Sequence, residues 1–391
     1  MRESAHRLGR YVKVTTGDER FEAYVPPSLL PPPALAPSLT RLHEQAVKAL
    51  GNLDGVTHIL PNIHLFVYQY VRKEALLSSQ IEGTQSSLSD FLLYEVEAAP
   101  GAPKNTDIEE VSNYVSALQY ALQRLEEGFP LSLRLIREIH GVLLSTGRGK
   151  DKLPGEFRKS QNWIGGTRPG NAVFVPPPPD YLMACLDDLE KFLHEEESGL
   201  PILIKAAVAH VQFETIHPFL DGNGRVGRLL IILMLKQAGL LEAPVLYLSL
   251  YFKTHRSTYY RLLNEVRETG QWDAWVEFFL TAVTETASNG YKTARHIVAM
   301  LPEHKARLKE LGRAAANAHR VLDCMQQYPV VDIQWLAKQL HLAPATVIAA
   351  LGHLMRLGIV KEITGGRRNQ AFAYDEYLRL LSEGTEPLAL S

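Results

Sequence analysis

The chain has 391 residues, of which 46% are apolar and 21% are charged, and its formal net charge at pH 7 is −2. This composition is typical of a globular protein with a buried core, and the length suggests two or three domains. The nearly balanced charge excludes a globally basic nucleic-acid coat and an acidic disordered tail. Only two cysteines occur, Cys185 and Cys324, which disfavours a disulfide scaffold and fits a reducing compartment.

The sequence also argues against a membrane protein. Its longest apolar stretch, residues 229–235, is too short to span a bilayer. The first fourteen residues contain no apolar run of the kind found in signal peptides. We therefore expect a soluble, cytoplasmic protein.

The first part of the chain changes from extended to helical patterns. Residues 10–25 predict two short extended segments around a turn, and the proline-rich residues 26–38 predict an irregular connector. From 37 to 97 the apolar residues recur every three or four positions, which predicts helices. Further helices are predicted at residues 107–127, 131–146, 180–195, 201–214, 224–239, 254–268 and 272–289.

One segment between these helices lacks helical periodicity. Residues 155–179 predict a β-hairpin, with arms at 157–164 and 172–175 and a turn rich in glycine and proline at 165–171.

The end of the chain predicts three more helices followed by two strands around Gly365 and Gly366, which is the winged-helix pattern. The fold class is therefore mainly α, with a β-hairpin and a C-terminal winged helix. We expect four regions: an extended and proline-rich segment (1–40), an N-terminal helical region (41–110), a helical core (111–295) and the winged helix (313–380).

The most informative stretch, residues 217–228, reads HPFLDGNGRVGR. Pro218 disfavours helical backbone at His217, so the preceding helix should end there. Residues 221–224 are typical of a turn, and the apolar run after them predicts another helix. The stretch is therefore a loop between two helices, with residues 222–224 at the N-terminus of the second.

This loop combines groups that suit nucleotide chemistry. Free N–H groups and the helix dipole make the helix N-terminus a natural anion site. Arg225 and Arg228 lie three apart, hence on one helical face, and suit a polyphosphate. Asp221 is a hard oxygen ligand of the kind that Mg²⁺ uses beside phosphates, and the usual pKa of His217 suits a general base. Together they indicate transfer of a phosphorus-containing group from a nucleotide.

Two simpler interpretations of the same loop fit less well. Residues 222–227 match the glycine pattern of dinucleotide-binding folds, but that fingerprint needs a preceding strand, and here a helix precedes. A helix-capping histidine beside an ordinary glycine turn would explain a lone His217. It does not explain the whole cluster.

The twelve residues resemble the Fic family motif, H-P-F-x-[D/E]-G-N-G-R-x-x-R, and match it at every defined position. Residues 155–179 resemble the flap of that family, including its GEFR start and FVPPPP exit. The resemblance runs over roughly residues 40–290. With its proline-rich front and winged-helix end, the chain is similar to bacterial two-domain protein adenylyltransferases of the Fic family.

The resemblance implies transfer of AMP from ATP, with Mg²⁺, to a Ser, Thr or Tyr hydroxyl of a target protein. His217 would take the proton, Asp221 would hold Mg²⁺ on the α and β phosphates, and Phe219 would anchor the loop. Arg225 and Arg228 would hold the β and γ phosphates. The anion hole and the rest of the ATP-binding stretch would consist of Gly222, Asn223, Gly224, Val226 and Gly227. Related kinases carry Lys at the position of Gly224, so this glycine favours AMP transfer.

A second stretch, SSQIEG at residues 78–83, resembles the family's inhibitory pattern [S/T]-x-x-x-E-[G/N]. Ser78, Glu82 and Gly83 occupy its defined positions. The resemblance implies that Glu82 pairs with Arg228 and takes the electrostatic partner of the γ phosphate. The alternative is that Glu82 is one solvated charge on a helix.

The resemblance implies two further parts of the site. The flap residues would align the target segment by strand addition. They are Asn162, Trp163, Ile164 and Gly165. Tyr260 and Asn264, four apart on one helix, would stack on and hydrogen-bond to the nucleobase, although Tyr260 could also be an ordinary core residue.

Two other functions stay open at this point. Fic proteins with an inhibitory glutamate can also remove AMP, and the winged helix could belong to a DNA-binding regulator with a nucleotide-sensing core. DNA binding is weakly supported because the last helix and the wing carry few cations. These residues are His353, Arg356, Lys361, Arg367 and Arg368. We expect a homodimer, self-modification besides a target protein, and no zinc, since the histidines lack metal-ligand spacing.

Overall fold

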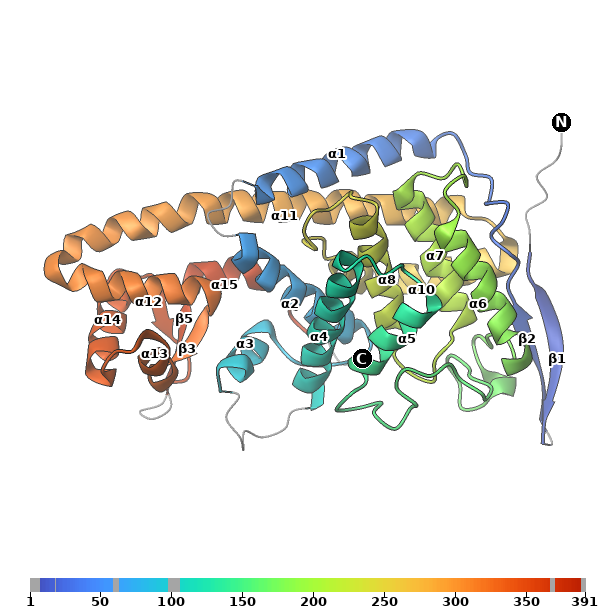
Figure 1. Ribbon diagram of the computed structural model, residues 1–391, viewed down its shortest axis with the longest axis horizontal. Coiled ribbons are helices and arrows are strands. Elements are labelled where there is room, and N and C mark those ends of the chain that lie inside the picture. The colour runs from blue at the N-terminus through green and yellow to red at the C-terminus, as the bar shows by residue number, and fades with distance from the viewer. Residues whose placement is uncertain (1–7, 18, 59–62, 98–105, 366–369, 388–391) are drawn as a thin grey trace.

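The computed structural model describes residues 8–17, 19–58, 63–97, 106–365 and 370–387. Its elements are mainly helices with two small antiparallel sheets, which confirms the predicted mainly α class. Figure 1 shows an elongated molecule with a large helical core at one end and a smaller C-terminal unit at the other. Among the helices of these ranges, none combines the length and the apolarity needed to cross a bilayer.

The N-terminal hairpin and the proline-rich segment form as predicted. Strands β1 (Arg10–Thr16) and β2 (Glu19–Val25) pair in antiparallel register. The proline-rich segment that follows contains no helix or strand. The carbonyl of Pro27 accepts a hydrogen bond from Gln212 Nε2 at 2.9 Å, which ties this connector to the helical core.

The helical core contains two short and eight longer helices in the described ranges. They are α1 (Leu39–Thr57), α2 (Ile63–Ile81), α3 (Leu88–Glu97), α4 (Thr106–Glu126), α5 (Leu133–Leu143), α6 (Pro179–His194), α7 (Ile202–Ile216), α8 (Asn223–Gln237), α9 (Ser249–Thr254) and α10 (Arg256–Thr269). Helices α7 and α8 are buried on nearly every side, as expected for segments that are apolar all round. Both ends of the loop between them are therefore held by buried helices.

The predicted hairpin over residues 155–179 is wrong in its extent. Only one bridge forms, between Ile164 and Phe174, with the Ile164 N–H donating to the Phe174 carbonyl at 2.8 Å. The four prolines at 176–179 cannot donate ladder hydrogen bonds, so the second arm ends at once. The flap is therefore a loop closed by a single bridge rather than a pair of strands.

The long helix α11 (Asp273–Arg307) joins the two ends of the molecule and packs along α1. Figure 1 shows the two helices side by side over much of their length. The sequence predicted that one helix ends at residue 289. The helix continues past that residue to Arg307 and is followed by a 3₁₀ segment, η2 (Leu308–Ala314).

The C-terminal unit has the element order predicted for a winged helix. Its helices are α12 (Ala315–Gln327), α13 (Ile333–Leu340), α14 (Pro344–Arg356) and α15 (Asp375–Ser382), and its strands are β3 (Val330–Asp332), β4 (Val360–Glu362) and β5 (Ala371–Tyr374). The strands form an antiparallel sheet in the order β3-β5-β4. The sequence missed β3 and α15. The tip of the predicted wing, with Arg367 and Arg368, lies outside the described residues.

Helix α2 links the core to the C-terminal unit. Gln69 Nε2 donates to the carbonyl of Gln327 at 3.0 Å, and Gln80 Nε2 donates to the carbonyl of Thr385 at 2.8 Å. The buried apolar core also continues from the helical core into the C-terminal unit. The predicted division into four regions stays a prediction, and the described contacts join the last region to α2.

Candidate active site

The loop from His217 to Gly222 lies between α7 and α8, as the sequence predicted. Helix α7 ends at Ile216, and His217 adopts left-handed backbone angles, φ 48° and ψ 62°. This conformation is costly for a residue other than glycine, so the surrounding contacts must hold it. Gly222 also has a positive φ, 77°, immediately before α8 begins at Asn223.

Asn223 closes this loop with its side chain. Its Oδ1 accepts the N–H of Phe219 at 2.8 Å, and its Nδ2 donates to the carbonyl of the same residue at 2.8 Å. The side chain of this predicted anion-hole residue is thus committed to Phe219. The group of Asn223 that can still bind an anion is its main-chain N–H at the start of α8.

His140 and Phe219 form the floor of the loop. Phe219 is fully buried and stacks on the imidazole of His140, with ring centroids 3.7 Å apart and planes 5° from parallel. His140 Nδ1 accepts the N–H of Gly155, so its Nε2 donates to the carbonyl of Asp221 at 3.0 Å. Burial lowers the pKa of His140 to about 4, which keeps this tautomer neutral at pH 7.

Arg158 holds the backbone around His217. Its guanidinium donates to the carbonyl of His217 at 2.9 Å and to the carbonyl of Ile216 at 3.3 Å, and its own N–H donates to the carbonyl of Pro218 at 2.9 Å. The side chain is buried, and burial lowers its pKa to about 10. Arg158 was recognised only as part of the GEFR segment, and no local pattern links it to His217.

The imidazole of His217 is neutral at pH 7. Burial lowers its pKa to about 3, and the nearby cations Arg267 and Arg158 act in the same direction. Its buried Nδ1 has no hydrogen-bond partner among the residues that the structure describes. A neutral imidazole with a free ring nitrogen can accept a proton, which is the property that the predicted general base needs.

Arg228 contacts the inhibitory stretch directly. Its Nε donates to Ser78 Oγ at 2.8 Å, and its Nη2 donates to the Ser78 carbonyl at 3.0 Å and to Glu82 Oε1 at 2.7 Å. The predicted pairing of Glu82 with Arg228 is therefore present, and the alternative of a solvated helix charge is wrong. Burial raises the pKa of Glu82, but the Arg228 guanidinium outweighs burial and lowers it overall.

The carboxylate of Glu82 lies against the N-terminus of α8. A Cβ atom on Gly224 would be 2.3 Å from Glu82 Oε1 and 3.0 Å from Arg228 Nη1. Only glycine leaves room for the carboxylate at this position. Glu82 therefore occupies the anion position that the sequence predicted for a phosphate.

Arg225 lies in a second cluster of charges. It is buried and pairs with Glu110 Oε2 at 3.2 Å and with Asp221 Oδ1 at 3.5 Å, while Glu110 also pairs with Arg148 at 3.1 Å. Burial raises the pKa of Glu110 although both arginines oppose it. The predicted phosphate ligand Arg225 is thus held by carboxylates, and the sequence missed Glu110.

Two residues of the predicted ATP-binding stretch point to the interior. Val226 is buried in the apolar core, and a Cβ atom on Gly227 would be 2.4 Å from Glu214 Oε1. The side chain of Val226 is thus committed to the core, and Gly227 lies against Glu214 of α7. Their contact with a nucleotide stays a prediction.

The nucleobase residues are placed at the edge of the site. Tyr260 is 38% exposed, whereas its neighbour Tyr259 is buried and donates to His210 Nε2 at 2.8 Å. Tyr259 is therefore the core residue of the two, and the partly exposed ring of Tyr260 can stack on a ligand. Asn264 Oδ1 accepts a hydrogen bond from Arg267 at 2.8 Å, which commits its carbonyl oxygen.

The flap is attached to the motif loop. Asn162 Nδ2 donates to the carbonyl of Phe219 at 3.0 Å, and Asn162 Oδ1 accepts the N–H of Trp163. The Trp163 side chain is 37% exposed, and the bridged Ile164 is followed by Gly165 at φ 69°. The flap residues therefore lie beside the loop that carries His217, and their contact with a target remains a prediction.

Asp221 can serve as the predicted metal ligand only together with ligands that are not protein side chains. Its Oδ1 accepts the N–H of Gly222 at 2.6 Å, and its side chain is 34% exposed. Within the described ranges no group of three or more His, Cys, Asp or Glu side chains could hold a metal ion. One accessible carboxylate suits Mg²⁺, which completes its coordination with water and substrate phosphate.

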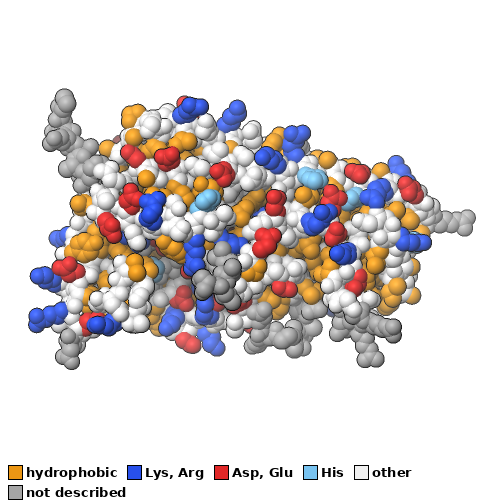
Figure 2. Space-filling model, turned by 180° about the vertical axis from the view of Figure 1, so that it is seen from behind, with side chains coloured by type: hydrophobic (Ala, Val, Ile, Leu, Met, Phe, Trp, Pro, Cys, Tyr) orange, Lys and Arg blue, Asp and Glu red, His pale blue; other side chains and the backbone are white. Residues whose placement is uncertain are grey.

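Three of the cations predicted for the last helix and the wing lie in the described part of the C-terminal unit. His353 and Arg356 contact each other through Nδ1 and Nη2 on α14, and Lys361 is exposed on β4. On the face shown in Figure 2, basic and acidic side chains alternate without a large basic patch. A duplex-binding role gains no support from that face.

Comparison with known proteins identifies two domains of one family. Residues 40–123 match the model described as Fic/DOC family N-terminal, and residues 130–235 match that described as Fic/DOC family. The chain therefore contains a Fic/DOC family N-terminal domain and a Fic/DOC family domain. Protein adenylyltransferase Fic of Drosophila willistoni is 30% identical over 248 residues, which cover 61% of this chain and 47% of that protein. The same protein of Drosophila grimshawi is 31% identical, with 61% and 48% covered.

Solved structures agree on the fold. A Fic family protein from Desulfovibrio desulfuricans G20 has a TM-score of 0.57 and 20% identity, with 88% of this chain and 98% of that chain covered. A Fic domain containing signaling protein from Bacteroides thetaiotaomicron VPI-5482 has a TM-score of 0.52 and 19% identity, with 64% and 95% covered. The chain spans about half the length of the curated relatives it matches.

Glu214 gives a pH-dependent prediction. It is buried, its Oε1 lacks a hydrogen-bond partner in the described ranges, and burial raises its pKa to about 7. The folded protein binds this proton more tightly than the unfolded chain does. The protonated carboxyl of Glu214 therefore contributes to the free energy of unfolding at low pH, and this contribution is lost as the pH rises through about 7. We expect Glu214→Gln to raise the melting temperature at pH 8. The free energy of unfolding should rise by at most about 3 kcal/mol. The difference should shrink toward pH 5. A melting difference that is constant from pH 5 to pH 8 would contradict this.

Proposed function

We propose that the chain is a protein adenylyltransferase, which transfers AMP from ATP to a Ser, Thr or Tyr hydroxyl of a target protein. The observation that carries this proposal is the position of Glu82, whose carboxylate bonds to Arg228 at the N-terminus of α8. An anion already lies there, and the neutral His217 stands at the other end of the same loop. The named relatives support the same activity.

The proposed step moves one proton and one phosphorus group. The target hydroxyl oxygen attacks the α phosphorus, and the bond from that phosphorus to the bridging β oxygen breaks. AMP is then bound to the target and pyrophosphate leaves. The hydroxyl proton passes to the unprotonated ring nitrogen of the neutral His217, whose basicity rises when the negatively charged nucleotide binds beside it.

The other residues bind and orient the nucleotide. The N–H groups at the start of α8 face the phosphates, and Arg228 pairs with the γ phosphate once Glu82 leaves. Tyr260 stacks on the base. Asp221 would hold Mg²⁺, which neutralises phosphate charge when bound. Arg225 lies between Asp221 and Glu110, so its first role is to orient Asp221.

Glu82 restrains this activity in the proposal. Arg228 is 2% exposed and serves one anion at a time, and Glu82 is tethered on the same chain at high local concentration. A charge-assisted pair of this kind is worth about 1.5–3 kcal/mol, or roughly 10- to 150-fold in productive occupancy. ATP therefore binds productively only after α2 releases Arg228.

The first test identifies the group that is transferred. The protein is incubated with Mg²⁺ and ATP labelled at the α or the γ phosphorus, together with a cell extract that supplies targets. We expect label on protein only from the α position. Label from the γ position would indicate a kinase and would contradict the proposal.

His217→Ala should reduce AMP transfer by at least about 100-fold while ATP binding stays near the unmutated level, because His217 takes the proton but does not hold the phosphates. The rate is measured with the α-labelled nucleotide and the affinity by calorimetry. His341→Ala is the matched control, since that residue also has left-handed backbone but follows α13 in the C-terminal unit. A His217 variant that transfers AMP at the unmutated rate would show that another group is the base.

Glu82→Gly should raise AMP incorporation by roughly 10- to 150-fold, including incorporation into the chain itself. The double variant Glu82→Gly with Arg228→Ala should stay as slow as the unmutated chain, because the γ phosphate then has no partner. Gln85→Gly removes a nearby exposed side chain and serves as the control for loosening of the segment. Intact-mass measurement decides. A double variant as active as Glu82→Gly would show that Arg228 does not hold the γ phosphate, and less AMP in Glu82→Gly would favour AMP removal.

A further inference from the structure

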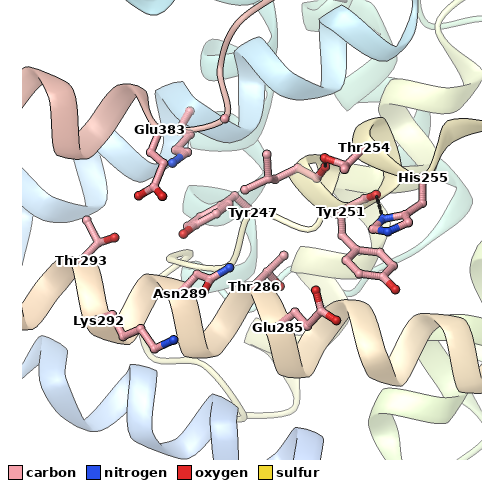
Figure 3. Close-up of a pocket in the computed structure, with 13 residues that line it drawn as sticks. Tyr247, Tyr251, Thr254, His255, Glu285, Thr286, Asn289, Lys292, Thr293 and Glu383 are labelled. Carbon is pink, nitrogen blue, oxygen red and sulfur yellow. Dashed lines mark hydrogen bonds between the residues drawn. The ribbon is translucent and has the colours of Figure 1, made fainter.

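A cavity of about 460 Å³ lies outside the candidate active site (Figure 3). It is bounded by α2, α9, α11 and the segment that follows α15. Its volume is within the usual range for small-molecule sites. None of its lining residues takes part in the candidate active site.

Lys73 of α2 lines this cavity with a buried ammonium group. The residue is only 4% exposed, and its Nζ lies 4.6 Å from the ring centroid of Tyr247. No hydrogen bond or ion pair to Lys73 is present among the described residues. Burial lowers its pKa to about 8, so at pH 7 the group is still mostly charged. A buried cation without an anionic partner is unfavourable, and an anion that enters the cavity would compensate it.

Glu383 also lines this cavity. It follows α15 and is exposed, and its charge is the main one that raises the pKa of Lys73. The two side chains nevertheless form no ion pair. Figure 3 shows the Glu383 carboxylate near Tyr247, across the cavity from Asn289 and Thr286 of α11. Two further charged side chains of the lining, Glu285 and Lys292 of α11, are exposed. Lys73 is therefore the buried charge of the cavity, and Glu383 is a lining carboxylate that is separated from it.

The rest of the lining has two characters. Tyr247, Leu250 and Tyr251 form an apolar and aromatic wall, while α11 contributes hydroxyl and amide groups, among them Thr286 and Asn289. A ligand that matches this lining has an apolar body and carries both charges at one end.

We propose that this cavity binds a small zwitterion of the α-amino acid class with an apolar side chain. Its carboxylate pairs with Lys73, its ammonium group faces Glu383, and its side chain packs on Tyr247 and Tyr251. Such a ligand satisfies both charges at once. A simple anion would leave Glu383 unpaired beside it.

The ligand would act on the inhibitory contact, a step that rests on the proposed function. Lys73 precedes Ser78 by five residues on α2, and Gln80 of the same stretch already donates to the carbonyl of Thr385. Lys253 Nζ also donates to the carbonyl of Gly384 at 3.3 Å. A zwitterion between Lys73 and Glu383 adds a further link between α2 and this terminal segment. It therefore stabilises the arrangement in which Glu82 occupies Arg228 and lowers AMP transfer.

The test is calorimetric titration of the full chain at pH 7 with L-phenylalanine as the probe. L-phenylalanine amide lacks the carboxylate, N-acetyl-L-phenylalanine lacks the ammonium group, and inorganic phosphate represents a simple anion. We expect binding of the amino acid, at least about 10-fold weaker binding of the other three probes, and loss of binding in Lys73→Met. Lys292→Met is the matched control, since Lys292 lines the same cavity but is exposed, and it should change the affinity less than about 3-fold.

Glu383→Gln on the exposed segment provides a second variant if Lys73→Met fails to fold, and it should weaken L-phenylalanine by at least about 10-fold. No binding at 10 mM probe, equal binding of the amide, or full binding by Glu383→Gln would each overturn the site. The regulatory step is measured separately as AMP incorporation with and without L-phenylalanine. Incorporation should fall in the unmutated chain and stay unchanged in Glu82→Gly. Binding without that difference would retain the site and overturn its link to Glu82.

Discussion

The site depends on one buried charge, the guanidinium of Arg228. It is 2% exposed at the heart of the helical core, and a cation in such a position needs an anion beside it. In this structure the anion is Glu82 at 2.7 Å, supported by the hydroxyl and the carbonyl of Ser78. The same guanidinium is the proposed partner of the γ phosphate, so the proposal assigns both inhibition and nucleotide binding to one charge.

Several features elsewhere follow from this pairing. Gly224 must lack a side chain because Glu82 Oε1 lies where its Cβ would be. Helix α2 must end beside the N-terminus of α8 to deliver the carboxylate, and its other face contacts the C-terminal unit through Gln69 and Gln80. Helix α2, which Glu82 follows directly, is therefore one of the elements through which the C-terminal unit contacts the core.

The parts that were predictable from the sequence are local. Proline after His217 and the glycines before α8 dictate the loop through backbone restrictions of neighbouring residues. The missed residues act over long separations: Arg158 is 59 positions from His217, His140 is 81 from Asp221, and Glu110 is 115 from Arg225. Periodicity and spacing carry no information on such contacts.

The flap and α11 show the same limit in the secondary structure. Residues 157–164 have an extended pattern, yet Arg158 and Asn162 donate to the motif loop instead of forming a ladder. The pairing of Glu82 with Arg228, 146 positions apart, was predicted only from the resemblance to a known motif. Helix α11 continues past its predicted end, and His304 and Lys305 there pair with Glu376 of α15 and Asp323 of α12, contacts that no local pattern reveals.

The most direct test of the account compares the affinities of ATP and ADP, measured by calorimetry with His217→Ala as the background so that no transfer occurs. In the presence of Glu82 the γ phosphate finds Arg228 occupied, so ATP should bind no more tightly than ADP. With Glu82→Gly added, ATP should bind at least about 10-fold more tightly than ADP, because only the γ phosphate gains the freed guanidinium. An ATP-to-ADP affinity ratio that is the same with and without Glu82 would contradict the claim that this carboxylate and the γ phosphate compete for Arg228.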